Sequence, residues 1–471
     1  MAESAAPLLS TLGAIVGQAN VLTAVADVAP YVTDWRDRYH GRAGAVVRPG
    51  TTAEVAAVVR CCGEHATPIV PQGGNTGLCG GATPHQGGTE IVVSLARLAR
   101  VRAIDTANAT LTVEAGVPLA RVQQAADEAG LFFPLSLGAE GSCTIGGNLS
   151  TNAGGTAVLR YGNARELVLG LEVVLADGRV WESLKGLRKD NTGYDVKQLF
   201  LGSEGTLGII TAAVLKLFPK PRTSATAFAA IADVDAAIAL LSVLRQTLGD
   251  RLTGFELVSR YCIELTRKAF PAFADPLPGH PWYALLQGQD PAADSPLKGQ
   301  LETALGTAIE REIARDATIA QSAAQADALW ALREHITEAQ RRDGPNIKHD
   351  ISLPVSRIPE FLREARGRLD AAFPGVRYVV FGHLGDGNLH YNLSAPAGVS
   401  PAAFMDESAR ANRIVYDLIA AHGGSFSAEH GIGQLKRGEL TRYKAAVEVE
   451  LMRRLKRALD PAGLLNPGKV V

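Results

Sequence analysis

The chain has 471 residues, more than one hydrophobic core usually supports, so we expect two or three domains. Hydrophobic residues make up 46% of it and charged residues 20%, as in an ordinary globular protein. Its 47 basic and 48 acidic residues are spread out with no basic tract, which argues against nucleic acid as a partner.

The first residues and the cysteines predict a compartment. The opening segment has neither the basic n-region of a secretory leader nor the arginines of a transit peptide, and it is too short and polar to span a bilayer. Five cysteines without a Cys-x-x-Cys pair favour a reducing environment. We therefore expect a cytoplasmic protein that is not a membrane protein. The opening segment instead predicts an amphipathic helix, with apolar residues at helical spacing at Leu8, Leu9, Leu12, Ile15 and Val16.

From about residue 43 to residue 218, short β-branched segments alternate with helical ones. A helix is predicted over 51–65, with Thr52 as its N-cap ahead of Glu54. The last of the predicted strand segments, 167–181, contains a turn at Asp177-Gly178. The segments expected to form strands are 44–49, 67–72, 89–95, 109–116 and 167–181.

A polar, proline-containing segment at 218–228 separates the strand-rich first part of the chain from a part with long helical segments. Long helical segments follow at 233–249 and 325–342, together with single strands such as 281–288, and these predict a second α+β domain with helices packed on a sheet. The last part is helical again at 445–460 and ends in PAGLLNPGKVV. We place domain boundaries near residues 220 and 424.

Three glycine-rich segments punctuate the first domain. The first, PQGGNTGLCGG at 71–81, is neither a P-loop nor a Gly-x-Gly-x-x-Gly fingerprint, although its backbone N–H groups could hold a pyrophosphate. On its own it could equally be a plain tight loop. The other two, at 136–155 and 199–211, add small residues in series that let a large flat ligand lie against main chain. Together they favour a nucleotide-containing cofactor.

Two histidines and a carboxylate form a candidate metal site. In FGHLGDGNLHYNL (381–393), a hairpin would bring His383 beside His390, and strand geometry puts His390 and Asn392 on one face. Glu429 and His430 follow in a later glycine-rich segment. Two imidazoles and a carboxylate are common ligands of catalytic zinc, and also suit iron or manganese. The alternative is two core histidines and an unrelated surface Glu-His pair.

A third group of residues could bind a carboxylate. Arg333 and Thr337 are four residues apart on one predicted helix face, and Lys348 follows in the predicted strand NIKHDISLP. A guanidinium, a hydroxyl and an ammonium that converge would hold a carboxylate well. The alternative is a solvated face of an amphipathic helix.

The three glycine-rich segments resemble the FAD-binding domain of the vanillyl-alcohol oxidase/p-cresol methylhydroxylase flavoproteins, and the chain from about residue 40 onward is most similar to their D-2-hydroxyacid dehydrogenase branch. The resemblance implies an α+β fold in three parts. These are a two-subdomain FAD-binding domain over 1–220, an α+β substrate (cap) domain with a helix-covered sheet over 221–424, and a helical C-terminal segment over 425–471 that completes the FAD and active sites.

The resemblance also assigns residues to FAD, with the first loop on the pyrophosphate and the others along the isoalloxazine, the ribityl chain and the adenosine half. Without a histidine in the first loop we expect non-covalent FAD, with Cys79 and Cys143 as the alternative attachment points. The assigned residues are Pro71, Gln72, Gly73, Gly74, Asn75, Thr76, Gly77, Leu78, Pro134, Gly138, Ser142, Cys143, Gly146, Gly147, Asn148, Thr151, Asn152, Gly154, Gly205, Gly208, Ile209 and Asn466.

In the active site the resemblance implies a divalent metal, with zinc expected, on His383, His390 and Glu429. The metal would hold the carboxylate and hydroxyl of a D-2-hydroxyacid, and His430 would act as the general base. The substrate-binding residues would be Arg333, Thr337, Lys348 and Asn392 together with His383 and His390.

Arg333, Thr337 and Lys348 match the substrate-carboxylate cluster of this branch in residue type and spacing. The resemblance therefore implies oxidation of D-2-hydroxyglutarate to 2-oxoglutarate, with hydride transfer to flavin N5. Electrons would pass to a separate acceptor such as an electron-transfer flavoprotein or a quinone, and a homodimer is the expected oligomer. One alternative is a D-lactate, D-malate or glycolate dehydrogenase on the same scaffold. The other is a non-catalytic FAD-binding subunit, which would have no need of His430 beside a metal site.

Overall fold

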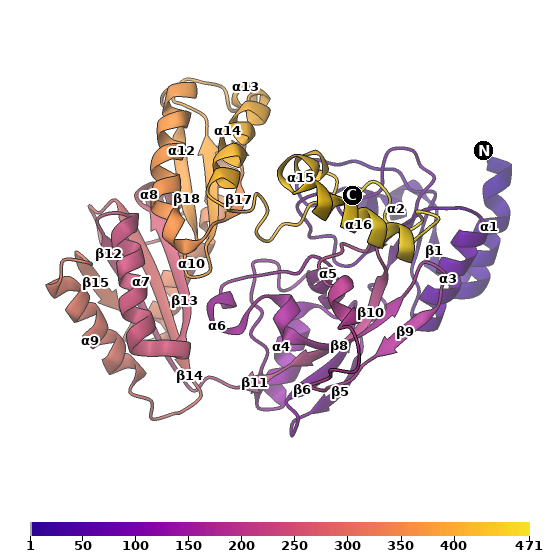
Figure 1. Cartoon of the computed structure of the whole chain (residues 1–471), viewed down its shortest axis with the longest axis horizontal. Coiled ribbons are helices and arrows are strands. Elements are labelled where there is room, and N and C mark those ends of the chain that lie inside the picture. The colour runs from indigo at the N-terminus through magenta and orange to yellow at the C-terminus, as the bar shows by residue number, and fades with distance from the viewer. Residues whose placement is uncertain (1) are drawn as a thin grey trace. The chain divides into compact units, whose positions relative to one another are not determined.

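The computed structural model describes residues 2–471, with side chains described from residue 6 onward, and the chain divides into two compact units (Figure 1). Unit 1 comprises residues 2–154, Gly162–Lys220 and Glu429–Val471, and unit 2 comprises Gly155–Tyr161 and Pro221–Ala428. Each unit is therefore assembled from segments far apart in the sequence. Over the described range, no helix is both long enough and apolar enough to cross a membrane.

The first sheet of unit 1 has the order β1-β2-β4-β3, with β2, β4 and β3 parallel and β1 antiparallel to β2. Strands β2 and β4 consist of small and β-branched residues and are fully buried, as is typical of parallel strands covered on both faces. The elements are α1 (Ala2–Val16), β1 (Val21–Leu22), α2 (Val25–Val32), β2 (Ala45–Val47), α3 (Thr52–Glu64), β3 (Ile69–Gln72) and β4 (Ile91–Ser94).

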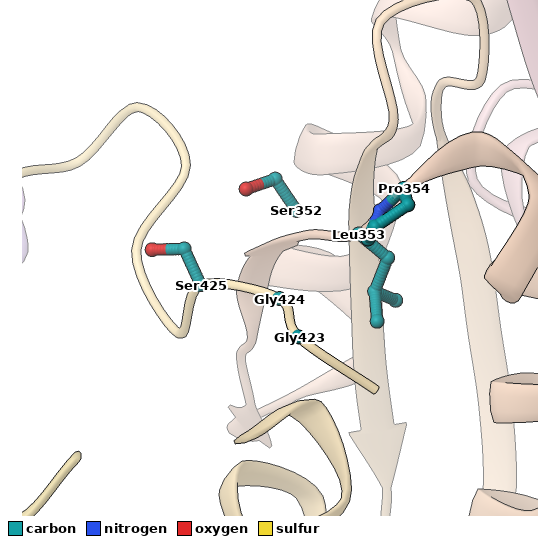
Figure 2. Close-up of a pocket in the computed structure, with 6 residues that line it drawn as sticks. All are labelled: Ser352, Leu353, Pro354, Gly423, Gly424 and Ser425. Atoms are coloured by element: carbon teal, nitrogen blue, oxygen red, sulfur yellow. The ribbon is translucent and has the colours of Figure 1, made fainter. Parts of the chain in front are cut away.

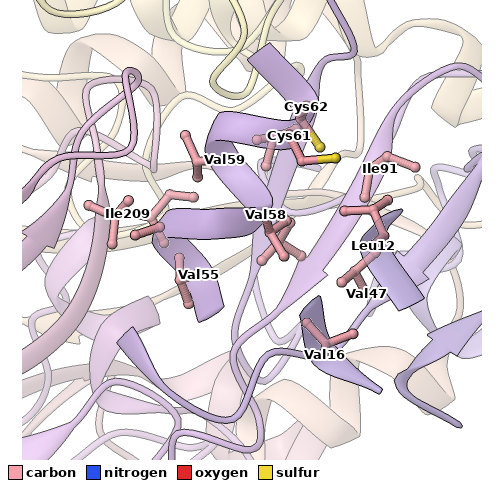
Figure 3. Packing of buried hydrophobic residues seen from close by; sticks show 14 of the residues in the cluster. Leu12, Val16, Val47, Val55, Val58, Val59, Cys61, Cys62, Ile91 and Ile209 are labelled. Atoms are coloured by element: carbon pink, nitrogen blue, oxygen red, sulfur yellow. The ribbon is translucent and has the colours of Figure 1, made fainter. Parts of the chain in front are cut away.

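Helices α1 and α3 bury their apolar faces in one cluster with this sheet (Figure 3). The predicted amphipathic first helix is confirmed, because Leu8, Leu12 and Val16 are buried there and Leu9 and Ile15 pack against the cluster. Other members, drawn in Figure 3, are Val47, Val55, Val58, Val59, Cys61, Cys62, Ile91 and Ile209.

The second sheet of unit 1 is antiparallel, in the order β5-β6-β10-β8-β9. The predicted turn at Asp177-Gly178 is confirmed, because it joins β8 to β9 with Gly178 at a φ of 76°. The remaining elements of unit 1 are β5 (Val101–Asp105), β6 (Thr110–Glu114), α4 (Leu119–Glu128), β7 (Leu131–Phe132), α5 (Ile145–Ser150), β8 (Val168–Val174), β9 (Val180–Ser183), β10 (Ile209–Lys216), β11 (Phe218–Pro219), α15 (Arg437–Tyr443) and α16 (Ala446–Leu459). Of these, β7 and β11 pair in a separate two-stranded sheet.

The predicted N-cap of α3 is wrong by one residue. The cap is Thr51, whose side-chain oxygen accepts a hydrogen bond from the N–H of Glu54 at 3.1 Å. Thr52 already belongs to the helix, and its hydroxyl donates to Glu172 Oε1 at 2.6 Å. Two consecutive threonines offered equal capping chemistry, and the carboxylate of Glu172, far along the chain, engages the second one.

Unit 2 is built on one sheet in the order β15-β12-β14-β13-β18-β19-β16, with β17 also paired to β19 (Figure 1). Helix α9 packs on β12, α8 on β18 and α7 on β13, so the expected sheet with packed helices is confirmed. The strands are β12 (Thr223–Ile231), β13 (Leu252–Ser259), β14 (Trp282–Asp290), β15 (Asp316–Ile319), β16 (Asn346–Ile347), β17 (Asp350–Ser352), β18 (Arg377–His383) and β19 (Asn388–Ser394). The helices are α6 (Val158–Tyr161), α7 (Val234–Leu248), α8 (Arg260–Ala269), α9 (Leu297–Glu310), α10 (Ala323–Glu334), α11 (Ile336–Asp343), α12 (Ile358–Ala372), α13 (Pro401–Asp406) and α14 (Ser408–Ala421).

Two predicted elements of unit 2 are interrupted. The helix expected over 325–342 is split into α10 and α11 at His335, whose ring Nδ1 and backbone N–H both lie within bonding distance of the Ala331 carbonyl, at 2.7 and 3.0 Å. The strand expected around Lys348 is split into β16 and β17, because the N–H of His349 donates to the side-chain Oδ1 of Asn392 in place of a backbone carbonyl.

Candidate functional site

The three glycine-rich loops of unit 1 lie against one another. A Cβ atom on Gly74 would overlap the backbone carbonyl oxygen of Ser142, so the first and second loops approach main chain to main chain. A Cβ atom on Gly205 would lie 3.1 Å from Pro71 Cγ, which brings the third loop against the first. The predicted convergence of these loops is therefore present within a single unit.

The same loops leave space and buried polar atoms that suit a bound cofactor. Cβ atoms on Gly77 and Gly138 would meet nothing within 4 Å. Thr144 Oγ1 and Asn466 Oδ1 are buried without a hydrogen-bond partner in the described part of the chain. Buried polar groups usually have partners, so these atoms fit a ligand with polar edges such as FAD.

Two of the predicted FAD residues hold the first loop in shape. Gln72 Nε2 donates to the carbonyls of Tyr31 and Ala82, at 2.9 and 2.8 Å. Asn75, at a φ of 51°, donates from Nδ2 to the Thr33 carbonyl at 2.9 Å. These side-chain amides therefore fix the first loop to its neighbours.

Other predicted FAD residues serve packing. Ile209 opens β10 and is 1% exposed in the apolar cluster of unit 1. A Cβ atom on Gly208 would lie 2.6 Å from Val173 Cγ1, so this glycine allows close packing of its loop. Cys79 and Cys143 are both buried, and burial raises the pKa of the Cys143 thiol.

A buried glutamate that the sequence did not predict joins the third loop to the C-terminal segment. The Glu204 carboxylate accepts hydrogen bonds from the N–H groups of Ile432 at 2.7 Å and Gly433 at 2.9 Å. Burial raises the pKa of Glu204, and these two hydrogen bonds oppose the rise. The contact fixes the chain two residues after His430. The available signal was an acidic residue between glycines in GSEG, which many surface loops share.

The C-terminal tail completes the first sheet of unit 1. Leu465 forms a parallel bridge with Ile69, and the N–H of Asn466 donates to the Ile69 carbonyl at 2.7 Å. Asn466 Nδ2 donates to the carbonyls of Gly81 and Glu204, at 2.9 and 2.8 Å, so this predicted FAD residue lies between the first and third loops.

A buried lysine lies beyond Asn466 in the same tail. Lys469 is 1% exposed, and its Nζ is 3.7 Å from Glu90 Oε1. Burial lowers the pKa of Lys469 to about 8 against the opposing effect of Glu90.

In unit 2 the predicted histidine hairpin is confirmed. Strands β18 and β19 pair with Phe381 opposite His390, and the ring centroids of His383 and His390 are 6.2 Å apart. Each histidine offers a ring nitrogen within 4.8 Å of the other's. Gly382, at a φ of 149°, permits this arrangement, because a Cβ atom there would lie 2.6 Å from the Asn388 carbonyl oxygen.

A second unpredicted glutamate, Glu256, lies beneath this pair. It stands directly opposite His383 in the β13–β18 ladder, and its side chain is fully buried. Its Oε1 contacts His383 Nδ1, and its Oε2 accepts from Arg333 at 2.8 Å from Nε and 2.7 Å from Nη2. Burial by itself would raise the pKa of Glu256, but the charges of His383 and Arg333 outweigh burial and lower this pKa to about 2.

Asp350 supplies a further carboxylate near the histidines. It pairs with His390 in the β17–β19 ladder, and one of its oxygens lies within 4.8 Å of a His390 ring nitrogen. Asn388 Nδ2 donates to Asp350 Oδ1 at 3.0 Å and orients this carboxylate. Unit 2 therefore gathers two imidazoles and a carboxylate at the β18–β19 hairpin.

The segment that leads out of unit 2 runs beside β17. Ser352 and Ser425 exchange backbone hydrogen bonds of 2.9 and 2.8 Å. Together with Leu353, Pro354, Gly423 and Gly424 they line a small pocket (Figure 2). Three residues on, the N–H of Ala428 donates to the Asp350 carbonyl at 3.3 Å.

Glu429 and His430 are the next residues along the chain and are the first of the C-terminal part of unit 1. The Glu429 carboxylate lies against the second glycine-rich loop, because a Cβ atom on Gly154 would overlap its Oε1. The predicted ligands His383, His390 and Glu429 thus come from both units, and the set of three stays a prediction.

The predicted carboxylate cluster is distributed over three environments in unit 2. Arg333 is 8% exposed in the last turn of α10, with its guanidinium carbon 4.6 Å from the centroid of the Phe381 ring. Thr337 is exposed in α11, and Lys348 is half-buried between β16 and β17. Both polar atoms of the Asn392 side chain are hydrogen-bonded within unit 2: Nδ2 donates to Gln340 Oε1, and Oδ1 accepts from the N–H of His349.

Comparisons with known proteins agree with this architecture. Residues 43–183 match the family model "FAD binding domain", and residues 220–470 match "FAD linked oxidases, C-terminal domain". A mitochondrial D-2-hydroxyglutarate dehydrogenase of Bos taurus is 41% identical over 96% of this chain and 81% of its own. A D-2-hydroxyglutarate dehydrogenase of Xanthomonas citri pv. viticola is also 41% identical, over 98% of this chain and 97% of its own. The crystal structure of p-cresol methylhydroxylase with substrate bound superposes with a TM-score of 0.77 at 18% identity, over 100% of this chain and 97% of its own.

Proposed function

Because this chain belongs to the FAD-linked oxidases, in the branch of the D-2-hydroxyglutarate dehydrogenases, we propose that it oxidises D-2-hydroxyglutarate to 2-oxoglutarate. The observation that carries the substrate is within unit 2, where one buried carboxylate contacts both a histidine of the candidate metal site and the candidate substrate arginine. A dicarboxylate can engage both groups at once, one at each end.

FAD supplies the two-electron acceptor of the reaction when it is bound. The residues of unit 1 fit it, because the glycine-rich loops present main chain and because Thr144 and Asn466 keep buried oxygens without partners. Asn466 lies between the first and third loops and would hold the cofactor's polar edge there.

The residue types at His383, His390 and Glu429 suit a divalent metal, and within unit 2 Asp350 adds a carboxylate near His390. The contact between Glu256 and His383 Nδ1 supports this, because it would leave Nε2 of His383 as the ring nitrogen that holds a metal, and carboxylates commonly stand behind metal-binding histidines in this way. When bound, the metal supplies a Lewis acid that lowers the pKa of the substrate hydroxyl. Zinc is the ion we expect.

The chain's own residues then divide the remaining tasks. His430 follows Glu429 directly and accepts the proton of the C2 hydroxyl at a ring nitrogen. Arg333, with Thr337 and Lys348 after it, holds the distal carboxylate. The electrons leave to a separate acceptor such as an electron-transfer flavoprotein or a quinone.

The test is anaerobic bleaching of the visible flavin absorbance. D-2-Hydroxyglutarate, its L-enantiomer, D-malate and D-lactate would be added in turn, before and after treatment with a chelator. We expect fast bleaching by D-2-hydroxyglutarate alone, and its loss after chelation. Faster bleaching by D-lactate would refute the substrate, and a protein without bound flavin would refute the cofactor.

A variant separates the base from the cofactor site. His430→Ala should retain FAD but abolish bleaching by the substrate, because the hydroxyl proton has lost its acceptor. Bleaching at a near-normal rate in this variant would exclude His430 as the base.

A further inference from the structure

Glu256 is the only carboxylate for which the described contacts reach both a predicted metal ligand and a predicted substrate cation. Its side chain has no exposed surface, and each oxygen has a separate task. Oε1 contacts His383 Nδ1, while Oε2 takes Nε and Nη2 of Arg333. It lies outside all the ligand and substrate positions that the sequence predicts.

Its place in the sheet explains how one residue reaches both partners. Glu256 and His383 are direct cross-strand neighbours in the β13–β18 ladder, so their side chains project from the same face. Arg333 approaches from the last turn of α10, and Phe381, two residues before His383 on β18, stacks beneath its guanidinium. Glu256 therefore fixes one edge of the Arg333 guanidinium, and Phe381 covers one of its faces.

From this geometry we infer that Glu256 is a positioning residue that couples the metal site to the substrate-carboxylate site. Holding Nδ1 of His383 sets the tautomer that leaves Nε2 for the metal. Holding Nε and Nη2 of Arg333 turns the Nη1 side of the guanidinium toward the substrate. This inference rests on the proposed function for its substrate half and on the histidine donors alone for its metal half.

The consequence is that one substitution should weaken two separate binding events. Glu256→Gln preserves size, but a glutamine presents an N–H to one of two partners that both donate. Either His383 or Arg333 then loses its acceptor and its fixed orientation. Carboxylates behind metal-bound histidines change metal affinity by about 10- to 100-fold when replaced.

The first measurement is zinc affinity of the oxidised, FAD-loaded protein, by competition with a chromogenic chelator, so that turnover is not involved. We expect Glu256→Gln to bind zinc about 10- to 100-fold more weakly than the unchanged protein. The second is binding of 2-oxoglutarate at saturating zinc, followed by the flavin absorbance change, which should also weaken. A zinc affinity within about twofold of the unchanged protein would overturn the inference.

The matched control is Glu114→Gln. Glu114 is equally unexposed and is held by two arginines, Arg100 and Arg102, but it lies in unit 1 on β6. We expect this control to leave zinc affinity unchanged. An equal loss of zinc affinity in both variants would mean that burial of any such carboxylate matters, and would also overturn the inference.

Three further outcomes are decided in advance. If Glu256→Gln does not fold, Glu256→Asp keeps the charge and shortens the reach, and the same loss of zinc affinity is expected from it. If the unchanged protein binds no zinc, the inference fails while bleaching by D-2-hydroxyglutarate still tests the proposed function. If zinc binding weakens as expected but D-2-hydroxyglutarate bleaches no flavin, the metal half stands and the proposed substrate fails.

Discussion

Replacing Gly382 by alanine should disrupt the histidine hairpin from within. The new Cβ atom would lie 2.6 Å from the Asn388 carbonyl oxygen and 2.9 Å from Leu389 Cα, where ordinary contact begins near 3.4 Å. The facing strand would have to move by about 0.8 Å, the difference between 3.4 and 2.6 Å. Overpacking of this kind costs about 1–3 kcal/mol, and an alanine held at a φ of 149° adds a strain of similar size.

We therefore expect Gly382→Ala to lower the free energy of unfolding by about 2 kcal/mol or more, and to weaken zinc binding because His390 lies on the displaced strand. Urea unfolding followed by circular dichroism measures the first effect, and chelator competition measures the second. The control is Gly367→Ala in α12, where a Cβ atom meets nothing within 4 Å. That change should be neutral or stabilise by about 0.5–1 kcal/mol. A Gly382→Ala protein as stable as the Gly367→Ala protein would refute the reasoning.

Three other substitutions test separate parts of the structure. Thr51→Ala should lower the free energy of unfolding by about 1 kcal/mol through loss of the α3 cap, and Thr51→Ser should restore most of it; no change in urea unfolding would contradict the cap. Lys348→Ala should raise the KM for D-2-hydroxyglutarate by about 10- to 100-fold, the value of one charge-assisted hydrogen bond, while the KM for D-lactate stays constant. Equal effects on both substrates would remove Lys348 from the distal-carboxylate site. Burial lowers the pKa of Lys469 to about 8, below its unfolded value of about 10.4, so the folded state releases this proton first. The stability of the unchanged protein relative to Lys469→Met should therefore rise between pH 8 and pH 10, and a flat difference in urea unfolding would exclude this.

Local patterns accounted for much of the fold. The apolar spacing from Leu8 to Val16 predicted α1, and His383 and His390 on either side of a glycine-rich turn predicted the hairpin. Such features depend on residues near each other in sequence, where helical and strand periodicities are visible. The convergence of the three glycine-rich loops depended on the family resemblance as well, because each loop alone reads as a turn.

The contacts of the two buried glutamates could not be predicted from the sequence. Glu256 meets His383 127 residues away, and Glu204 meets Ile432 228 residues away. Neither glutamate belongs to a local motif. An acidic residue within an apolar strand, or between two glycines, gives no indication in the sequence of which distant residue it contacts. The sequence also did not predict the break between α10 and α11 at His335. The apolar spacing of a helix continues through His335, and only the contact of its ring with the Ala331 carbonyl marks the end of α10.

The C-terminal tail also sets an order of events during synthesis. Strand β3 emerges from the ribosome early, but its neighbour at Leu465 and the anchoring hydrogen bonds of Asn466 belong to residues made almost last. Unit 2, which ends at Ala428, is complete before those residues exist. A nascent chain can therefore fold unit 2 while the first sheet of unit 1 still has an unpaired edge. Until the C-terminal tail is made, the edge of β3 that pairs with Leu465 stays exposed. Proteins truncated before Leu465 should therefore depend on chaperones, because this unpaired strand edge can associate with other chains.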